Sequence, residues 1–122
     1  MTRKKIILIT GAGGEVGQGL VEHLHHTSDS LPVVAMDLRE MGEAITTKVE
    51  AAIVGNVLDD TLLQKLNDDY EIDTIYHLAA MLSTSAEFNP EMAHRVNVRG
   101  TINLLEIAVE QGQARGEPVK FI

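Results

Sequence analysis

Several glycines stand close together near the N-terminus, in the segment Thr10-Gly-Ala-Gly-Gly-Glu-Val-Gly17. Their G-x-x-G-x-x-G spacing differs from the general G-x-G-x-x-G pattern, but its place between an apolar run and a helical pattern indicates a phosphate-binding turn. Gly11 would allow the sharp turn, Gly14 would leave room for a pyrophosphate, and Gly17 would let the helix pack closely against the strand. Backbone N–H groups at the helix start, including those of Glu15 and Val16, could then bind phosphate with help from the helix dipole.

Asp37 ends the next apolar run, 20 positions after Gly17. A carboxylate at about this distance can accept hydrogen bonds from the hydroxyls of an adenosine ribose. It would also repel a 2′-phosphate, which favours NAD over NADP as the cofactor. Arg39 instead favours NADP, because a nearby arginine can accommodate the 2′-phosphate. The simpler alternative is a glycine turn with a solvated aspartate at a strand end.

Alternating strands and helices are expected to position these residues. Short apolar runs predict strands at 5–10, 31–37, 49–54, 72–78 and 119–122. Helical spacing predicts a first helix over 14–26, a short helix capped by Asp59 or Asp60, and a helix from Pro90 to about Gly112, with a polar connection over 39–48. Such βαβ units predict an α/β, Rossmann-type, doubly wound parallel sheet of about five strands in the order 3-2-1-4-5.

The expected helices should bury apolar residues at helical spacing. In the first helix these are Val16, Leu20, Val21 and Leu24, and in the last they are Val96, Leu104, Leu105, Ile107 and Ala108. The chain of 122 residues has room for one domain with one hydrophobic core. Aromatic residues make up only 3% of it, so the core must consist of aliphatic side chains, as is typical of parallel sheets.

Charge and composition exclude several classes of function. The net charge of −8 disfavours nucleic acids and anionic membrane surfaces as partners. The absence of cysteine excludes disulfides, thiolate catalysis and cysteine-ligated metals, and it fits a cytoplasmic protein. No apolar segment approaches the roughly 18 residues that a membrane-spanning helix needs. The chain is therefore expected to bind neither nucleic acid nor membrane.

The histidines and paired acids do not form a convincing metal site. His23, His25 and His26 fall at the end of a predicted helix with no evident set of further ligands, so we expect no metal there. His77 ends a buried strand and is expected to be a structural histidine, and His94 should lie on a solvated helix face. The acids Asp59, Asp60, Asp68 and Asp69 are interpreted as capping and solvating residues of a short helix.

Five motifs in order resemble those of the extended short-chain dehydrogenases/reductases, the NAD-dependent epimerase/dehydratase family. They are the glycine segment, Asp37, Gly55-Asn-Val57, His77-Leu-Ala-Ala80 and Asn97-Val-Arg-Gly-Thr-Ile-Asn-Leu-Leu105. The resemblance covers essentially the whole chain. Within the family, the segments 79–88 and 95–100 look most like those of D-erythronate dehydrogenase and its relatives.

The resemblance implies an NAD site along these motifs. It places Leu38 and Arg39 beside Asp37 at the adenosine ribose, and Asn56 and Val57 at the adenine. Asn56 departs from the family's usual acid, but its carbonyl oxygen could still accept a bond from the adenine amino group. Leu78, Ala79 and Ala80 would line the nicotinamide side, Asn97 would lie near the cofactor, and Ser83 is a candidate substrate contact.

The residues that the family uses for catalysis are missing from this chain. Catalysis there requires a Ser or Thr and a Tyr-x-x-x-Lys pair, in which lysine lowers the pKa of the tyrosine. Four residues after Tyr70 stands Thr74, and four after Tyr76 stands Ala80. We therefore expect 1–122 to be the N-terminal part of an NAD-binding Rossmann domain, truncated in its fifth strand and inactive alone, with the catalytic and substrate-binding regions absent.

Three functional hypotheses remain open on the sequence. The first is the NAD-binding part of an epimerase, dehydratase or dehydrogenase that acts on a sugar nucleotide or a small hydroxylated substrate. The second is a non-catalytic NAD-sensing module, and the third is an interaction domain without a cofactor. The expected exposure of an apolar strand edge and of the long helix also predicts a homodimer or other self-association.

Overall fold

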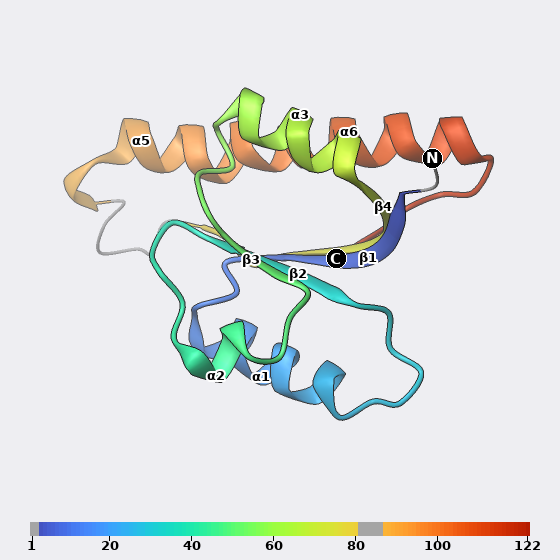
Figure 1. The fold of residues 1–122 in the computed structure, drawn as a ribbon. Coiled ribbons are helices and arrows are strands. Elements are labelled where there is room, and N and C mark those ends of the chain that lie inside the picture. Colours follow the sequence, from blue (N-terminus) through green and yellow to red (C-terminus); the bar gives the residue numbers. More distant parts are fainter. Residues whose placement is uncertain (1–2, 81–86) are drawn as a thin grey trace.

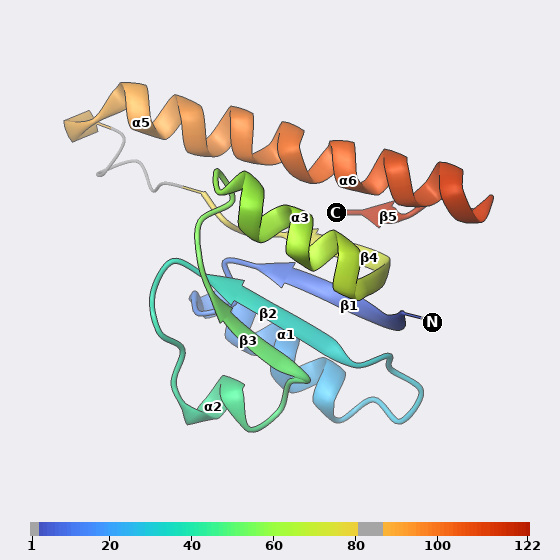
Figure 2. The same cartoon turned by 45° about the horizontal axis from the view of Figure 1, so that its top comes forward.

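The computed structural model describes residues 3–80 and 87–122, and its centre is a five-stranded parallel sheet in the order β3-β2-β1-β4-β5. The predicted strand order is therefore confirmed. The strands are β1 (Lys4–Thr10), β2 (Val33–Asp37), β3 (Ala51–Val54), β4 (Tyr70–His77) and β5 (Lys120–Phe121). Since all of them are parallel, their carboxyl ends meet at one edge of the sheet (Figure 2).

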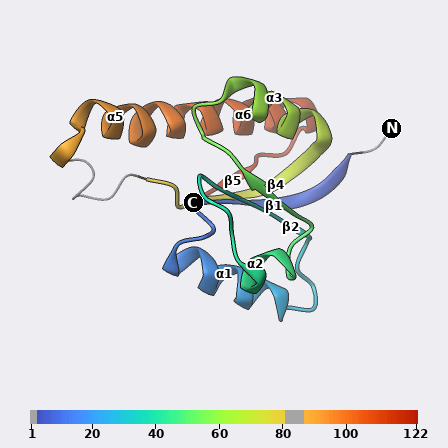
Figure 3. The same ribbon diagram turned by 60° about the vertical axis from the view of Figure 1, so that its left-hand side comes forward.

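Helices cover both faces of this sheet (Figure 1). One face carries α1 (Glu15–His25) and α2 (Glu43–Thr46). The other carries α3 (Asp60–Asp69) and a long rod made of α5 (Pro90–His94), the π-helical turn η1 (Arg95–Arg99) and α6 (Gly100–Arg115). Figure 3 shows the same arrangement from another side, with the sheet between the two layers.

Each central strand packs its side chains alternately into two aliphatic cores, one on each face of the sheet, where the sequence predicted a single core. In β1, Ile6 and Leu8 face the layer of α3 and α6, whereas Ile7 and Ile9 face the layer of α1 and α2. This two-sided burial explains why the strands appear in the sequence as unbroken apolar runs. Within the described residues no helix is both long and apolar enough to cross a membrane.

Helix boundaries follow the capping residues that the sequence offers. The Asp59 carboxylate accepts the Leu62 N–H at the start of α3, and Asn89 does the same for Met92 ahead of Pro90. The last helix continues past Gly112 to Arg115, because the left-handed C-cap is Gly116, with φ +76°.

Four local expectations were wrong. Val16 is 71% exposed because it lies in the first turn of α1, beyond the sheet edge, and Leu105 is 41% exposed on the outer side of α6. The expected polar connection over 39–48 contains the short helix α2, which buries Ile45. The rod is also not a uniform α-helix, because the Gly100 N–H bonds to the Arg95 carbonyl five residues back.

Candidate cofactor site

The glycine segment connects β1 to α1 in a turn that only glycine can make at two points. Gly11 has φ +65°, and a Cβ there would lie 2.7 Å from the backbone nitrogen of Ala79. A Cβ on Gly17 would lie 2.5 Å from the carbonyl oxygen of Ala12. The start of α1 at Gly17 therefore packs closely against Ala12 of the turn, and the turn at Gly11 packs closely against Ala79 after β4.

The start of α1 is open at the sheet edge. Gly14 is its N-cap and supplies no side-chain cap, in contrast to Asp59 and Asn89 on the opposite face of the sheet. The first backbone N–H groups of a helix have no partner within the helix. The Gly14 N–H already donates to the Gly11 carbonyl over 3.1 Å, whereas Glu15 and Val16 are exposed, so their N–H groups are the donors that an anion can reach.

Asp37 lies directly beside the glycine turn. One carboxylate oxygen accepts the Gly13 N–H over 2.9 Å, and the other accepts the Arg39 N–H over 3.2 Å. A carboxylate has about four acceptor positions, so each oxygen retains capacity for one further donor. Leu38 and the Arg39 side chain are exposed beside it.

The loop after β3 is held against the long rod. Val57 is buried, and its methyl group fills the space where Gly100 has no Cβ, at 2.5 Å from the position that such a Cβ would take. The Asn103 side chain donates to the Val57 carbonyl over 3.0 Å. Asn56 Oδ1 accepts the Leu58 N–H over 2.9 Å, which fixes the loop and leaves its other lone pair for a ligand.

The end of β4 meets the end of β1 at the same edge. Leu78 donates its N–H to the Thr10 carbonyl over 3.1 Å, and the Ala79 N–H donates to the Thr10 hydroxyl over 3.2 Å. Ala80 is exposed. His77 is half-buried, and its ring nitrogens lie 2.7 Å from Thr10 Oγ1 and 2.9 Å from Thr101 Oγ1, as expected for a structural histidine.

The remaining candidates lie on or near the rod. Asn97 is exposed in the π-helical turn η1, and its carbonyl accepts the Thr101 hydroxyl over 2.7 Å. Ser83 lies outside the described residues, as do all of 81–86 within the segment 79–88 that resembles D-erythronate dehydrogenase. Of the histidines at the end of α1, His26 bonds to the Glu22 carboxylate, which also pairs with Lys48, so a carboxylate does lie beside them. The described residues contain no group of three or more such side chains placed to hold a metal.

The structure thus brings the predicted residues of four loops to one edge of the sheet. Hydrogen bonds from backbone N–H groups connect them: that of Gly13 donates to the Asp37 carboxylate, that of Gly55 to the Asp37 carbonyl, and that of Ala79 to the Thr10 hydroxyl. The sequence did not single out Thr10, Gly13, Thr101 or Asn103, which hold these loops together. Thr10 and Thr101 lie within recognised motifs, but only their spatial pairing with His77 reveals what they do.

Comparison with known proteins agrees with this arrangement. A family model described as the NAD dependent epimerase/dehydratase family matches residues 7–121. An uncharacterised epimerase/dehydratase from Staphylococcus saprophyticus is 37% identical over 106 residues, which cover 87% of this chain and 33% of that protein.

Solved structures of related enzymes share the fold. A monomeric L-threonine 3-dehydrogenase from a metagenome superposes with a TM-score of 0.75 at 33% identity, over 87% of this chain and 33% of that one. The ADP-L-glycero-D-manno-heptose-6-epimerase of Helicobacter pylori gives a TM-score of 0.76 at 27% identity, over 89% of this chain and 36% of that one. The chain therefore spans about a third of the length of these relatives.

Proposed function

Since the chain belongs to the NAD-dependent epimerase/dehydratase family, we propose that it is the NAD-binding part of an enzyme that transfers hydride reversibly to and from a hydroxylated substrate. The observation that carries the proposal is the sheet edge where the uncapped start of α1, the open Gly14 and the Asp37 carboxylate lie together. Phosphates and a ribose are the ligands that suit these groups.

The residues at this edge fit an NAD molecule. A Cβ on Gly14 would make only an ordinary 3.4 Å contact, with the Gly11 carbonyl oxygen, so the space beyond this glycine is open to a pyrophosphate. The N–H groups of Glu15 and Val16 would bind the phosphates, the buried Gly17 would let the helix start lie close to the turn, and Asp37 would accept the ribose hydroxyls. We place Asn56 and Val57 at the adenine, and Leu78 to Ala80 with Asn97 on the nicotinamide side.

The chemistry divides between the cofactor and the protein. NAD, when bound, accepts or returns the hydride, whereas the residues of this chain bind and orient it. Neither Tyr70 nor Tyr76 is followed by a lysine at the fourth position, as the family's base requires. We therefore propose that the 122 residues alone bind NAD without turning over a substrate.

The substrate class is proposed from the named relatives. One is named for L-threonine and the other for a sugar nucleotide, and both molecules carry a secondary hydroxyl that an NAD enzyme can oxidise. A sugar nucleotide or a small hydroxylated compound therefore fits the proposal equally.

The test is a matched pair of valine substitutions. Gly14→Val should lower NAD affinity at least about a hundredfold, because the added methyl groups occupy the phosphate space, while the extended backbone at Gly14 (φ −73°, ψ 174°) accepts valine. Gly19→Val is the control, since a Cβ on this helical glycine meets nothing within 4 Å. Isothermal calorimetry measures both affinities, and thermal unfolding confirms that both variants fold. Equal NAD affinity in the two folded variants would rule out the phosphate assignment.

A further inference from the structure

The His77 imidazole lies between two threonines that belong to different parts of the proposed cofactor site. Thr10 is the last residue before the glycine turn, and Thr101 follows the π-helical turn that contains Asn97. We propose that His77 is a positioning residue, held as the neutral Nε2–H imidazole, which fixes the glycine turn relative to the helix turn that carries Asn97. The inference rests on the proposed function only for its effect on NAD binding.

The hydrogen bonds of the Thr101 hydroxyl show that the His77 Nε2 carries a proton. Thr101 Oγ1 donates its single proton to the Asn97 carbonyl, which can only accept. Toward His77, whose Nε2 lies 2.9 Å away, this oxygen is therefore an acceptor. The ring nitrogen must supply the proton, so Nε2 is protonated.

The other ring nitrogen is an acceptor by similar reasoning. Thr10 is fully buried, and its oxygen already accepts the Ala79 N–H. If His77 were an imidazolium, Nδ1–H would donate to the same oxygen, and the Thr10 proton would lose the acceptor that it has 2.7 Å away. With a neutral ring, Thr10 donates to Nδ1 and every proton in the series has one acceptor.

The surroundings of the ring agree with the neutral form. Its partners Thr10 and Thr101 and the Phe121 ring, whose centroid lies 6.0 Å away, are uncharged. Burial lowers the pKa of His77 below its usual value. The imidazole is therefore neutral at pH 7, with both nitrogens used.

These hydrogen bonds form a chain that connects the two sides of the proposed cofactor site. It runs from the Ala79 N–H through Thr10, His77 and Thr101 to the Asn97 carbonyl, and so includes the end of β1, the end of β4 and the rod. Gly11 follows Thr10 directly, so a shift of Thr10 would move the phosphate turn. Loss of the Thr10 or Thr101 hydroxyl should therefore weaken cofactor binding without a direct contact, because it would displace the glycine turn.

The first measurement is independent of any cofactor. Nuclear magnetic resonance of the ring nitrogens at pH 7 should show a protonated Nε2 and an unprotonated Nδ1 for His77. The His77 signals are assigned by their absence from the spectrum of His77→Gln. The opposite tautomer, a cationic ring or averaging between tautomers would overturn the proposal. A chain that fails to bind NAD leaves this measurement unaffected, so failure of the proposed function is recognised separately.

The second measurement tests the effect on the site. Thr101→Val removes the acceptor of Nε2–H with little change of shape and should weaken NAD binding about three- to tenfold, whereas Thr101→Ser should restore it. Thr47→Val is the matched control. Thr47, the C-cap of α2, also donates its hydroxyl proton to a carbonyl four residues back, that of Glu43. If Thr101→Val and Thr47→Val bind NAD equally, or if serine fails to restore binding, His77 has no positioning role.

Discussion

The Asp37 carboxylate holds the glycine turn, and we propose that it also discriminates between cofactors. Its two oxygens accept the N–H groups of Gly13 and Arg39, so the carboxylate fixes the glycine turn before any cofactor arrives. Its charge remains at the sheet edge, where a 2′-phosphate would have to lie. We therefore propose that the residue that shapes the turn also favours NAD over NADP.

We predict that Asp37→Asn narrows the preference for NAD over NADP by about tenfold, which corresponds to about 1.4 kcal/mol. Asparagine keeps an oxygen that can accept the Gly13 N–H but removes the charge that repels the phosphate. Calorimetric dissociation constants for both cofactors give the ratio. A preference for NADP in the unchanged chain would instead show that Arg39 dominates the pocket.

Sequence patterns identified residues whose roles depend on their neighbours in the sequence. They missed residues whose roles depend on tertiary contacts. Gly11, Gly17 and Asp37 could be recognised because their types and spacing follow from the geometry of one βαβ unit. Thr10 and Thr101 could not, because they meet at His77 only through the register of β1 on β4 and the direction of the rod. The exposure of Leu105 was missed because a helical period does not say how wide the buried side of a helix is.

At the scale of elements, strands and long helices were predictable and local irregularities were not. The alternation of apolar runs and capped helices gave all five strands, with ends displaced by up to two residues. The C-cap of the π-helical turn is Gly100, which packs against Val57 of the loop after β3, and no local pattern in the sequence records this contact. The short helix α2 has a single buried residue, Ile45, and is too short for a periodic pattern.

The rod is joined to β4 by a buried glutamine. Gln111 is 3% exposed, and its oxygen accepts the Ile72 N–H over 2.6 Å. Its amide donates to Asn67 Oδ1 and to the Tyr70 carbonyl. These bonds lie beside the extra residue that β4 has relative to β1, between Ile72 and Thr74, where a strand needs outside partners.

We predict that Gln111→Leu lowers the free energy of unfolding by about 2 kcal/mol, because the buried Ile72 N–H and Asn67 Oδ1 lose the bonds that Gln111 makes to them, while the Tyr70 carbonyl keeps a bond from Arg3. The exposed Gln113, two residues further along α6, provides the control Gln113→Leu, which should change stability by less than about 0.5 kcal/mol. Urea unfolding measures both. Equal destabilisation would mean that the hydrogen bonds of Gln111 contribute nothing.

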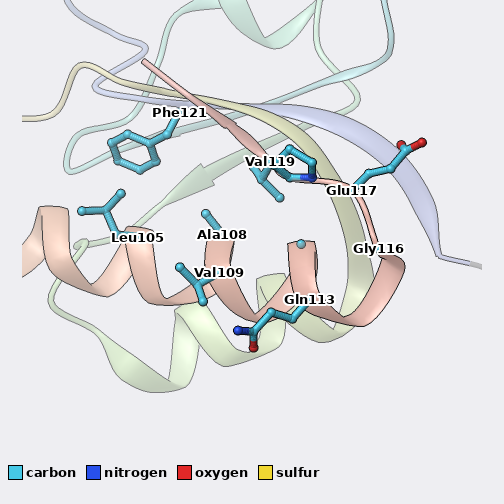
Figure 4. Close-up of a pocket in the computed structure, with 10 residues that line it drawn as sticks. Leu105, Ala108, Val109, Gln113, Gly116, Glu117, Val119 and Phe121 are labelled. Carbon is cyan, nitrogen blue, oxygen red and sulfur yellow. The ribbon is translucent and has the colours of Figure 1, made fainter.

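At the scale of the whole molecule, one side remains apolar and open. Val98, Ile102, Leu105 and Val109 form an exposed apolar stripe along the rod. Beside it, Leu105, Val109, Val119 and Phe121 line a groove between α6 and the edge strand β5 (Figure 4). We propose that this face supports self-association of the chain, since apolar patches and open sheet edges favour it.

Sedimentation velocity over a wide range of concentrations should therefore show a dimer or larger species, and Val109→Lys should shift the chain toward monomer. The lysine places a charge in the exposed stripe and leaves the core untouched, because Val109 is 56% exposed. A monomer at every concentration would contradict the proposal, and one solved relative is named as monomeric.

We propose that NAD binds at the carboxyl ends of the strands. Backbone amide spectra of the isotope-labelled chain, recorded during titration with NAD, test it most directly. The claim predicts that the largest shifts occur at Gly14, Val16, Arg39 and Val57, while Val109 and Val119 in the apolar groove stay unchanged. Shifts confined to that groove, or no saturable shift at millimolar NAD in a folded chain, would contradict it.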